Sequence, residues 1–369
     1  MIPYARQHIS QDDIAAVASA LRSDWLTQGP QVAVFEKALA LYCGVKYVVA
    51  VSNGTAALHI AYLAAGIVSG DEAITTPNTF VATTNMLLAV GVKPVFSDIR
   101  LDTYNLNQEE IEKHITKKTK VIVPVHFAGQ SCDMSAIRSI AKKHKLLVIE
   151  DACHALGGQY RQKKIGSCAY SDMAVFSFHA IKSITTAEGG AVLTNNKKFY
   201  EKMLRVRSHG IHKDKSGFNV MSEFGYNYRL TELQAALGLS QLKQLNRFIA
   251  ARRKVARAYQ VALEGIPGII APTELDQNTS AWHLYVIRTK KASDRLPLYR
   301  HLQQSGIGIN FHYPAVYSHP YYKKLGFKGR QCPHMELYGK TAITLPMHVS
   351  VSERDIKTIA QAIKLYFNV

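Results

Sequence analysis

The stretch KLLVIEDACHALGG, residues 145–158, is a short aliphatic run that ends in two carboxylates. A strand that is aliphatic on both faces is typical of a parallel sheet covered by helices on both sides. Six more short, β-branched runs alternate with helix-like stretches; they lie at 46–51, 72–76, 93–99, 120–126, 172–178 and 190–195. This alternation predicts an α/β fold with a seven-stranded, mainly parallel sheet.

Helix-like stretches between these runs supply the covering layers. Apolar patterns that begin at Thr55, Phe80 and Asp133 predict three of the helices. The third has an acidic N-cap and a basic last turn, which the helix dipole favours. We therefore expect helices on both faces of the sheet.

A second, smaller domain follows a long helical pattern. Thr231 and Gln234 have the spacing of a capping box and open a pattern that runs to about Leu263. Beyond it, the sequence predicts a strand at 282–289, a helix around 293–304 and a terminal helix near 352–366. We expect a large domain over residues 1–245 and a small C-terminal α/β domain over residues 246–369.

The formal net charge of +18 raises the question of an anionic partner. The basic clusters are short and scattered, at 117–120, 142–145, 161–164 and 251–254. None alternates with aromatic residues as a single-strand binding surface does, and no helix-turn-helix or zinc-finger signature is present. The clusters are typical of solvated helix faces, so we expect no nucleic-acid partner.

The cysteines and the N-terminal sequence indicate the cellular compartment in which the protein is expected. Five cysteines, an odd number without a C-x-x-C pair, predict reduced thiols rather than disulfides or a metal site. The N-terminus, MIPYARQHISQDDIAAV, lacks the basic-then-apolar layout of a signal peptide, and no segment is apolar enough to span a bilayer. We therefore expect a cytoplasmic protein without a membrane partner.

The turn after the first strand, SNGT at residues 52–55, is a candidate phosphate site. Ligands of open α/β sheets bind beyond the carboxyl ends of the strands. The small residues Gly54 and Thr55 allow close approach to the free N–H groups of a helix start, which suit a phosphate. Ser, Asn and Thr are equally ordinary helix N-caps, and the turn contains no Walker A lysine and no G-x-G-x-x-G.

The carboxylates after the aliphatic strand are the second candidate. Glu150 and Asp151 are followed by His154. A carboxylate aimed into a cleft can bind a metal, act as a base or hold a cationic heterocycle. The alternative is that Asp151 only caps a helix.

The third candidate is FSFHAIKSITTAEGG, residues 176–190, which brings Ser177 and Lys182 after another apolar strand. A desolvated lysine loses its proton readily, as a nucleophile toward a carbonyl group must. An isolated lysine would be interpreted as solvent-exposed. A strand-edge carboxylate, a phosphate-like turn and an apolar-flanked lysine are together the parts that bind pyridoxal phosphate.

The fourth candidate is aromatic. Phe80, in PNTFVATTN, lies at the start of a helix, where its face could stack on a planar ring. The alternative is an ordinary core phenylalanine.

Five segments in order resemble the DegT-type nucleotide-sugar aminotransferases, which have the fold-type-I pyridoxal phosphate architecture. The resemblance extends from Ile2 to the C-terminal helix, essentially the whole chain. The segments are SNGTAALHIAYLAAG, EDACHALGGQY, SFHAIKSITTAEGGAVLTN, GYNYRLTELQAALGLSQL and INFHYPAVY.

The resemblance implies roles for the candidate residues. Lys182 would bind the cofactor covalently and shuttle a proton, and Asp151 would face the pyridine nitrogen. His154 would neighbour the phenolic oxygen and Phe80 would stack on the ring. The phosphate would be surrounded by Gly54, Thr55 and Ser177.

The resemblance also implies a homodimer and a substrate site. Asn227 would reach the phosphate in the neighbouring subunit, so that two chains share each active site. The sugar nucleotide would contact Tyr4, Asp24, Trp25, Leu26, Thr27, His312, Tyr313, Pro314 and Ala315.

The implied reaction moves an amino group from L-glutamate to a UDP-4-keto-6-deoxy-N-acetylhexosamine. The product would be UDP-4-amino-4,6-dideoxy-N-acetyl-β-L-altrosamine, on the route to pseudaminic acid. Tyr317 stands in a region where many relatives have a histidine, which leaves the sugar configuration open. A UDP-pentose or dTDP-hexose aminotransferase and a pyridoxal-phosphate-binding regulator are the alternatives.

Overall fold

The computed structural model describes residues 1–329 and 331–369, and a seven-stranded sheet lies at its centre. In spatial order the strands are β1 (Tyr47–Val51), β9 (Gly190–Thr194), β8 (Met173–Ser177), β5 (Leu147–Asp151), β4 (Thr119–Val123), β2 (Glu72–Thr75) and β3 (Lys93–Phe96). β9 is antiparallel to both of its neighbours, and the other pairs are parallel. All seven predicted runs are strands of this sheet, which confirms the predicted fold class.

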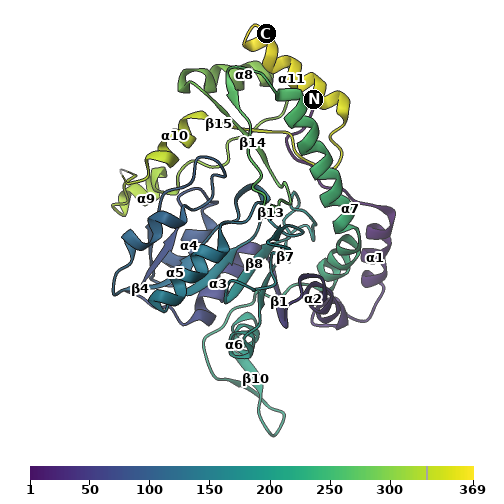
Figure 1. The fold of residues 1–369 in the computed structure, drawn as a ribbon. Coiled ribbons are helices and arrows are strands. Elements are labelled where there is room, and N and C mark those ends of the chain that lie inside the picture. The colour runs from purple at the N-terminus through teal and green to yellow at the C-terminus, as the bar shows by residue number, and fades with distance from the viewer. Residues whose placement is uncertain (330) are drawn as a thin grey trace.

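Helices cover both faces of the sheet, as Figure 1 shows. Along β1, Val49 and Val51 pack into the apolar cluster of one face, whereas Val48 and Ala50 pack into that of the other. This alternation follows from the two-residue period of a strand. The first face carries α3 (Gly54–Ala65), α4 (Ala82–Ala89) and α6 (Lys197–Arg207); the second carries α2 (Pro30–Cys43), α5 (Met134–His144) and the first part of α7 (Glu232–Leu263).

The helix α7 connects the sheet to the smaller C-terminal unit (Figure 1). Thr231 and Gln234 form the predicted capping box at its start. The C-terminal unit has an antiparallel sheet with its own apolar cluster. Its elements are β12 (Ile269–Ile270), β14 (Tyr285–Thr289), β15 (Ala342–Leu345), α8 (Arg295–Gln304), α9 (Pro320–Lys324), α10 (Pro333–Thr341) and α11 (Glu353–Tyr366). The predicted strand and both predicted helices of this region are confirmed.

The first residues of the chain join the C-terminal unit. Ile2 forms a parallel bridge with Ile307, and the backbone oxygen of Tyr4 accepts the N–H of Met347 at 3.0 Å. The chain then passes to α1 (Gln11–Leu21), which packs on α7. The first residues of the chain therefore pack against the small C-terminal domain. The predicted division of the chain at residue 245 stays a prediction.

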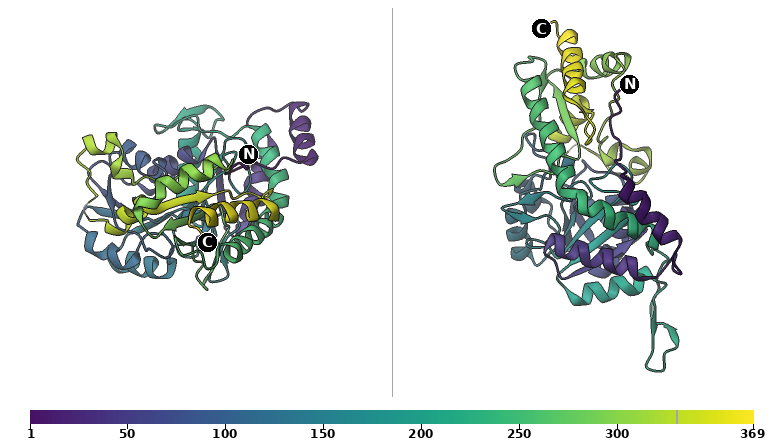
Figure 2. Two further views of the ribbon diagram at one scale, coloured as in Figure 1. Left: turned by 90° about the horizontal axis from the view of Figure 1, so that it is seen from above. Right: turned by 90° about the vertical axis from the view of Figure 1, so that its right-hand side faces the viewer.

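Several short elements have no counterpart among the predicted ones. The hairpin of β10 (Ile211–Lys213) and β11 (Asn219–Met221) projects from the body of the molecule, as Figure 1 and the right view of Figure 2 show. Phe218 and Met221 on this hairpin are 72% and 61% exposed. The others are β6 (Gln159–Tyr160), β7 (Lys163–Lys164), β13 (Asn278–Thr279) and the 3-10 turns Gln108–His114, Phe127–Gly129, Ala292–Asp294 and Val316–Ser318.

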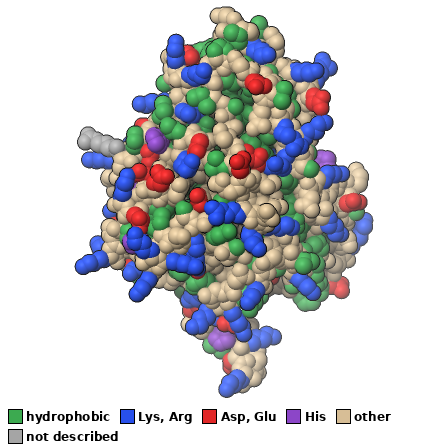
Figure 3. Space-filling model, in the orientation of Figure 1, with side chains coloured by type: hydrophobic (Ala, Val, Ile, Leu, Met, Phe, Trp, Pro, Cys, Tyr) green, Lys and Arg blue, Asp and Glu red, His purple; other side chains and the backbone are tan. Residues whose placement is uncertain are grey.

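The basic side chains are distributed over the surface. On the face shown in Figure 3, lysines and arginines lie among acidic, polar and apolar residues and form no single continuous patch. Within the described residues, no helix combines the length and the apolar composition that a bilayer crossing requires.

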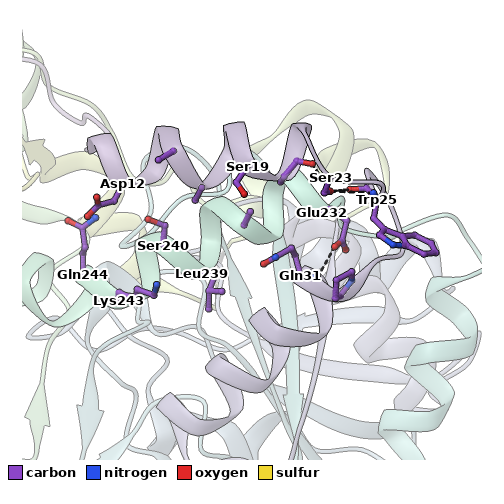
Figure 4. Close-up of a pocket in the computed structure, with 15 residues that line it drawn as sticks. Asp12, Ser19, Ser23, Trp25, Gln31, Glu232, Leu239, Ser240, Lys243 and Gln244 are labelled. Atoms are coloured by element: carbon purple, nitrogen blue, oxygen red, sulfur yellow. Dashed lines mark hydrogen bonds between the residues drawn. The ribbon is translucent and has the colours of Figure 1, made fainter.

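Glu232, the first residue of α7, caps a different helix. The N-cap position of α2 is Gly29, which has no side chain to accept the free N–H groups of the first turn. Glu232 is 1% exposed, and its carboxylate accepts the N–H of Gln31 at 2.7 Å and that of Val32 at 3.3 Å (Figure 4). This contact fixes the start of α2 against α7.

We predict that Glu232→Ala lowers the free energy of unfolding by about 2 kcal/mol, because two partly buried N–H groups at the start of α2 lose their acceptor. Urea denaturation followed by circular dichroism measures the change. Glu264→Ala, at the exposed end of the same helix, is the control and should change the value by less than about 0.5 kcal/mol. Equal effects of the two substitutions would contradict a capping role.

Candidate active site

A cavity of about 860 Å³ lies where the carboxyl ends of β1, β5 and β8 meet the C-terminal unit. Parallel strands end at the same edge of a sheet, so this position agrees with the rule for open α/β sheets. The structure brings ten of the predicted site residues to this one cavity. They are Tyr4, Gly54, Thr55, Phe80, Asp151, His154, Ser177, Lys182, His312 and Tyr313.

Lys182 lies in the connection between β8 and β9. Its backbone N–H bonds to the carbonyl of His179 at 3.0 Å, which forms a tight turn after the strand. Burial lowers the pKa of the Lys182 ammonium, and nearby Cys153 and Asp151 only partly offset this effect. The neutral, nucleophilic amine is therefore reached at a lower pH than for an exposed lysine.

Asp151 is the last residue of β5 and is 5% exposed. Its Oδ2 accepts the hydroxyl of Thr83 at 2.6 Å, and its Oδ1 accepts the backbone N–H of Cys153 at 3.2 Å. The Thr83 hydroxyl also lies 2.7 Å from that of Thr79. The carboxylate is thus held in one orientation at the wall of the cavity.

Glu150, the other carboxylate of the pair, points away from Asp151, because adjacent side chains of a strand face opposite sides. Its Oε2 lies 2.7 Å from Nε2 of His126, and the hydroxyl of Ser171 donates to its Oε1. Among the described residues, no group of three or more metal-ligating side chains comes together. Asp151 therefore faces the cavity, whereas Glu150 is hydrogen-bonded to His126 and Ser171 and does not line it.

The turn before α3 meets the end of β8. Asn53 caps the helix by accepting the N–H of Ala56 at 2.8 Å. A Cβ built on Gly54 would lie 2.9 Å from Cβ of Ser177, closer than carbon atoms approach. The missing side chain leaves the first N–H groups of α3 open beside the Ser177 hydroxyl, an arrangement that suits a phosphate.

Three buried imidazoles form part of the cavity wall: His154, His283 and His312, which are 7%, 4% and 7% exposed. Burial, together with the charge of Lys182, holds the pKa of His154 well below its usual range and lowers that of His312 to about 4. The rings of His154 and His283 have their centroids 4.4 Å apart. Burial likewise holds the pKa of His283 well below its usual range, so all three are neutral at pH 7.

Two polar contacts orient this wall. Nε2 of His154 lies 3.2 Å from the hydroxyl of Tyr313, and Nδ1 of His312 lies 2.9 Å from that of Thr344. Nδ1 of His154 is buried without a hydrogen-bond partner among the described residues. A ligand atom in the cavity would satisfy it.

The other predicted site residues lie elsewhere or at the rim. Phe80 is 58% exposed at the cavity wall, with its ring 6.1 Å from that of Tyr313. Within the described residues, the cavity lining does not include Asp24, Trp25, Leu26, Thr27, Pro314, Ala315 or Asn227.

Trp25 instead lines a second cavity of about 480 Å³ between α1 and α7 (Figure 4). Ala315 is buried in an apolar cluster with Phe96. Asn227 is exposed and forms a bridge with Ser208 at the base of the projecting hairpin.

Sequence patterns missed several residues of the cavity. Thr79 and Thr83 lie in a segment where only Phe80 stood out, and Tyr228 and His283 also line the cavity. His283 directly precedes a strand of the C-terminal unit and lies in none of the motifs that stood out in the sequence. A lone histidine in an apolar strand region gives no signal that separates it from a core residue.

A family model described as the DegT/DnrJ/EryC1/StrS aminotransferase family matches residues 7–364. The chain belongs to this family. The predicted family is thereby confirmed over almost the whole length of the chain.

Relatives of this DegT-family chain agree with the assignment. It is 40% identical to the spore coat polysaccharide biosynthesis protein SpsC of Bacillus subtilis, in an alignment covering 98% of this chain and 96% of SpsC. PseC of Helicobacter pylori, an aminotransferase involved in the biosynthesis of pseudoaminic acid, superposes with a TM-score of 0.95 at 36% identity and covers 100% of this chain and 99% of PseC.

The pyridoxal phosphate form of Spr1654 from Streptococcus pneumoniae, a putative sugar aminotransferase, superposes with a TM-score of 0.94 at 29% identity. The match covers 100% of this chain and 98% of that one. The DegT-family chain is therefore a sugar aminotransferase that depends on pyridoxal phosphate. The predicted cofactor and enzyme class are confirmed.

We predict that Gly54→Ala weakens the affinity for pyridoxal phosphate at least about tenfold, because the new methyl group would separate the start of α3 from Ser177. Titration of the apoenzyme by absorbance measures the dissociation constant. Gly339→Ala is the control: Gly339 also lies in a helix, α10, and its Cβ would meet no atom within 4 Å. Unchanged affinity in Gly54→Ala would contradict a phosphate site at this turn.

Proposed function

We propose that this aminotransferase transfers the amino group of L-glutamate to C4 of a UDP-linked 4-keto-6-deoxy-N-acetylhexosamine. The product is UDP-4-amino-4,6-dideoxy-N-acetyl-β-L-altrosamine, an intermediate on the route to pseudaminic acid. The similarity to PseC over the whole chain carries the proposal. SpsC, at 40% identity, is named for spore coat polysaccharide biosynthesis, which supports a second candidate, a related 4-keto nucleotide sugar such as a UDP-pentose or a dTDP-hexose.

Two residues carry the chemistry in this proposal. When bound, pyridoxal phosphate supplies an aldehyde that accepts the amino group and a ring that withdraws electrons from the carbon that loses its proton. Nζ of Lys182 holds the cofactor covalently and, when displaced, moves the proton. The lowered pKa of Lys182 favours both roles, because each requires the neutral amine.

Asp151 keeps the pyridine nitrogen protonated in this proposal. The bonds from Thr83 and from the N–H of Cys153 fix the plane of its carboxylate. A negative charge held in a buried site stabilises a cationic ring more strongly than one in water does. The orientation is set before the cofactor binds, so little reorganisation is needed.

Further residues bind the rest of the cofactor in the proposed assignment. The phosphate lies at Gly54, Thr55 and Ser177, where the geometry of the α3 start supports it. His154 contacts the phenolic oxygen through its unpartnered Nδ1. The exposed ring of Phe80 covers one face of the pyridine ring.

The sugar contacts the wall formed by Tyr4, His312 and Tyr313. Neutral imidazoles and a phenol donate and accept hydrogen bonds without attracting an anion, which suits hydroxyl and carbonyl groups. The remaining predicted substrate residues, from Asp24 to Thr27 together with Pro314 and Ala315, lie outside the lining within one chain. Asp24 to Thr27 fit the proposal if a second copy brings them to the site.

Charge supports a homodimer with shared sites. Lys182 is the only lysine or arginine among the described residues that line the cavity, although the diphosphate of a sugar nucleotide and the carboxylates of glutamate all need cations. We propose that a second copy completes the site. Exposed Asn227 and the hairpin of β10 and β11, which carries exposed Lys213 and Lys215 beside its apolar side chains, are the segments that reach across.

We expect the proposed UDP-4-keto-6-deoxy-N-acetylhexosamine to have a kcat/KM at least about a hundredfold above those of a UDP-4-keto-pentose and a dTDP-4-keto-6-deoxyhexose. Amino-sugar formation with L-glutamate, followed by mass spectrometry, measures it. Lys182→Ala is the blank and should form no product. Equal or better turnover of either other sugar would overturn the proposed substrate.

Mixing two inactive variants tests the shared site. In a dimer of Lys182→Ala and Asn227→Ala chains, one site carries both changes and the other carries neither. Random exchange of subunits should therefore restore roughly a quarter of the wild-type activity. If each site belongs to one chain, the mixture stays as inactive as its components, and Asn227 then acts within its own subunit.

A further inference from the structure

Arg252 is a buried cation that the proposed chemistry does not use. It lies in the second half of α7 and is 3% exposed. Its Nη1 donates to the backbone oxygens of Trp282 at 3.2 Å, His283 at 3.3 Å and Met347 at 3.0 Å. Its buried Nε has no hydrogen-bond partner among the described residues.

Such an environment is unusual for a guanidinium. A buried charge is ordinarily paired with an opposite charge, because desolvation is costly. Here the bonds of Arg252 go to three carbonyl oxygens, and the cost shows in its pKa, which burial lowers to about 10. A costly group of this kind near a cavity calls for a functional explanation.

The three carbonyl oxygens belong to two segments, one of which carries a cavity residue while the other is hydrogen-bonded to one. His283 itself lines the cavity. Met347 is linked to a second lining residue, because its N–H donates to the backbone oxygen of Tyr4 at 3.0 Å. Arg252 therefore contacts, directly or through one hydrogen bond, two parts of the cavity wall that are far apart in the sequence.

Arg252 lies on α7 between the part that packs on the large sheet and the part that packs in the C-terminal unit. Phe248 and Ile249, just before it, belong to the apolar cluster under the large sheet, whereas Val255 and Ala256 belong to that of the C-terminal unit. Arg252 thus lies where α7 passes from one cluster to the other. Hydrogen bonds from Arg252 at this point hold the C-terminal side of the cavity at a fixed position relative to the large sheet.

We propose that Arg252 is a positioning residue that ties Tyr4 and His283, the small-domain wall of the cavity, to α7, and so sets the distance between the acceptor sugar and Lys182. The proposal rests on the proposed sugar site. It assigns no contact between Arg252 and the substrate, since Arg252 does not line the cavity among the described residues.

The charge of Arg252 adds a second effect on the same wall. Burial holds the pKa of His283 well below its usual range, and the charges of Lys182 and Arg252 lower it further. His283 therefore stays neutral and keeps one donor and one acceptor.

Arg252→Met, which keeps an unbranched apolar side chain close to the length of the aliphatic part of arginine but removes the donors, tests the positioning role. We expect the KM for the accepted keto sugar to rise about tenfold, equivalent to ~1.4 kcal/mol, because the wall loses its tie. The half-reaction with L-glutamate and the affinity for pyridoxal phosphate should stay close to those of the wild type. Arg252→Lys keeps a charge and hydrogen-bond donors on a shorter side chain, so its KM for the keto sugar should lie between those of the wild type and Arg252→Met.

Hydrogen exchange of the cofactor-loaded enzyme gives a readout that does not depend on activity. The amides of Met347 and of Gly308, which bond to Tyr4 and Ile2, should exchange faster in Arg252→Met, whereas β8 should not change. Arg257→Met is the matched control, because Arg257 is exposed one and a half turns further along α7.

The outcomes separate the two proposals. The positioning role is overturned if Arg252→Met matches Arg257→Met in exchange at Met347 and in KM, or if exchange rises equally in β8, which would indicate a general loss of stability. It is also overturned if Arg252→Lys shows no recovery while Arg252→Met affects both half-reactions alike.

If the wild type accepts none of the UDP-4-keto sugars, the proposed function fails. Hydrogen exchange at Met347 and Gly308 then still decides whether Arg252 holds the cavity wall in place.

Discussion

The close approach of Gly54 to Ser177 is the constraint on which the site depends. It brings the start of α3 against the end of β8, although 123 positions of sequence separate the two residues. Only a residue without a side chain allows this distance, and only strands that run in the same direction end at the same edge. Once the two ends meet, Asp151 on β5, next to β8, and Lys182, five residues beyond Ser177, necessarily face the same cavity.

The sequence predicted the parts whose physics is local. Each of the seven strands is a short aliphatic run. A strand that is buried on both faces has this composition whichever strands lie beside it, so the run can be recognised without knowing the order of strands in the sheet. The capping box of Thr231 and Gln234 is likewise a contact between near neighbours. Lys182, Asp151 and Gly54 stood out because each lies at the end of such a run or within a few residues after it.

Residues that act through distant contacts left no such pattern. His283, Thr83 and Arg252 obtain their positions from packing between segments, and each looks like an ordinary core or surface residue in its own stretch. The hairpin of β10 and β11 was missed because its apolar side chains are exposed in the single chain, so their spacing reflects no internal core. The second cavity, which contains Trp25, depends on how α1 lies on α7.

The antiparallel strand β9 has a consequence for how this architecture diversifies. Because β8 and β9 are neighbours, the segment from Phe178 to Gly189 returns directly into the sheet and needs no crossover helix. Pairing of the two strands is closed at its base by the N–H of Phe178 and the carbonyl of Gly189, at 2.7 Å. Lys182 thus belongs to a short connection whose two ends are held together independently of its side chain. A substitution at position 182 can therefore change the chemistry of the cavity while the order and register of the strands stay the same.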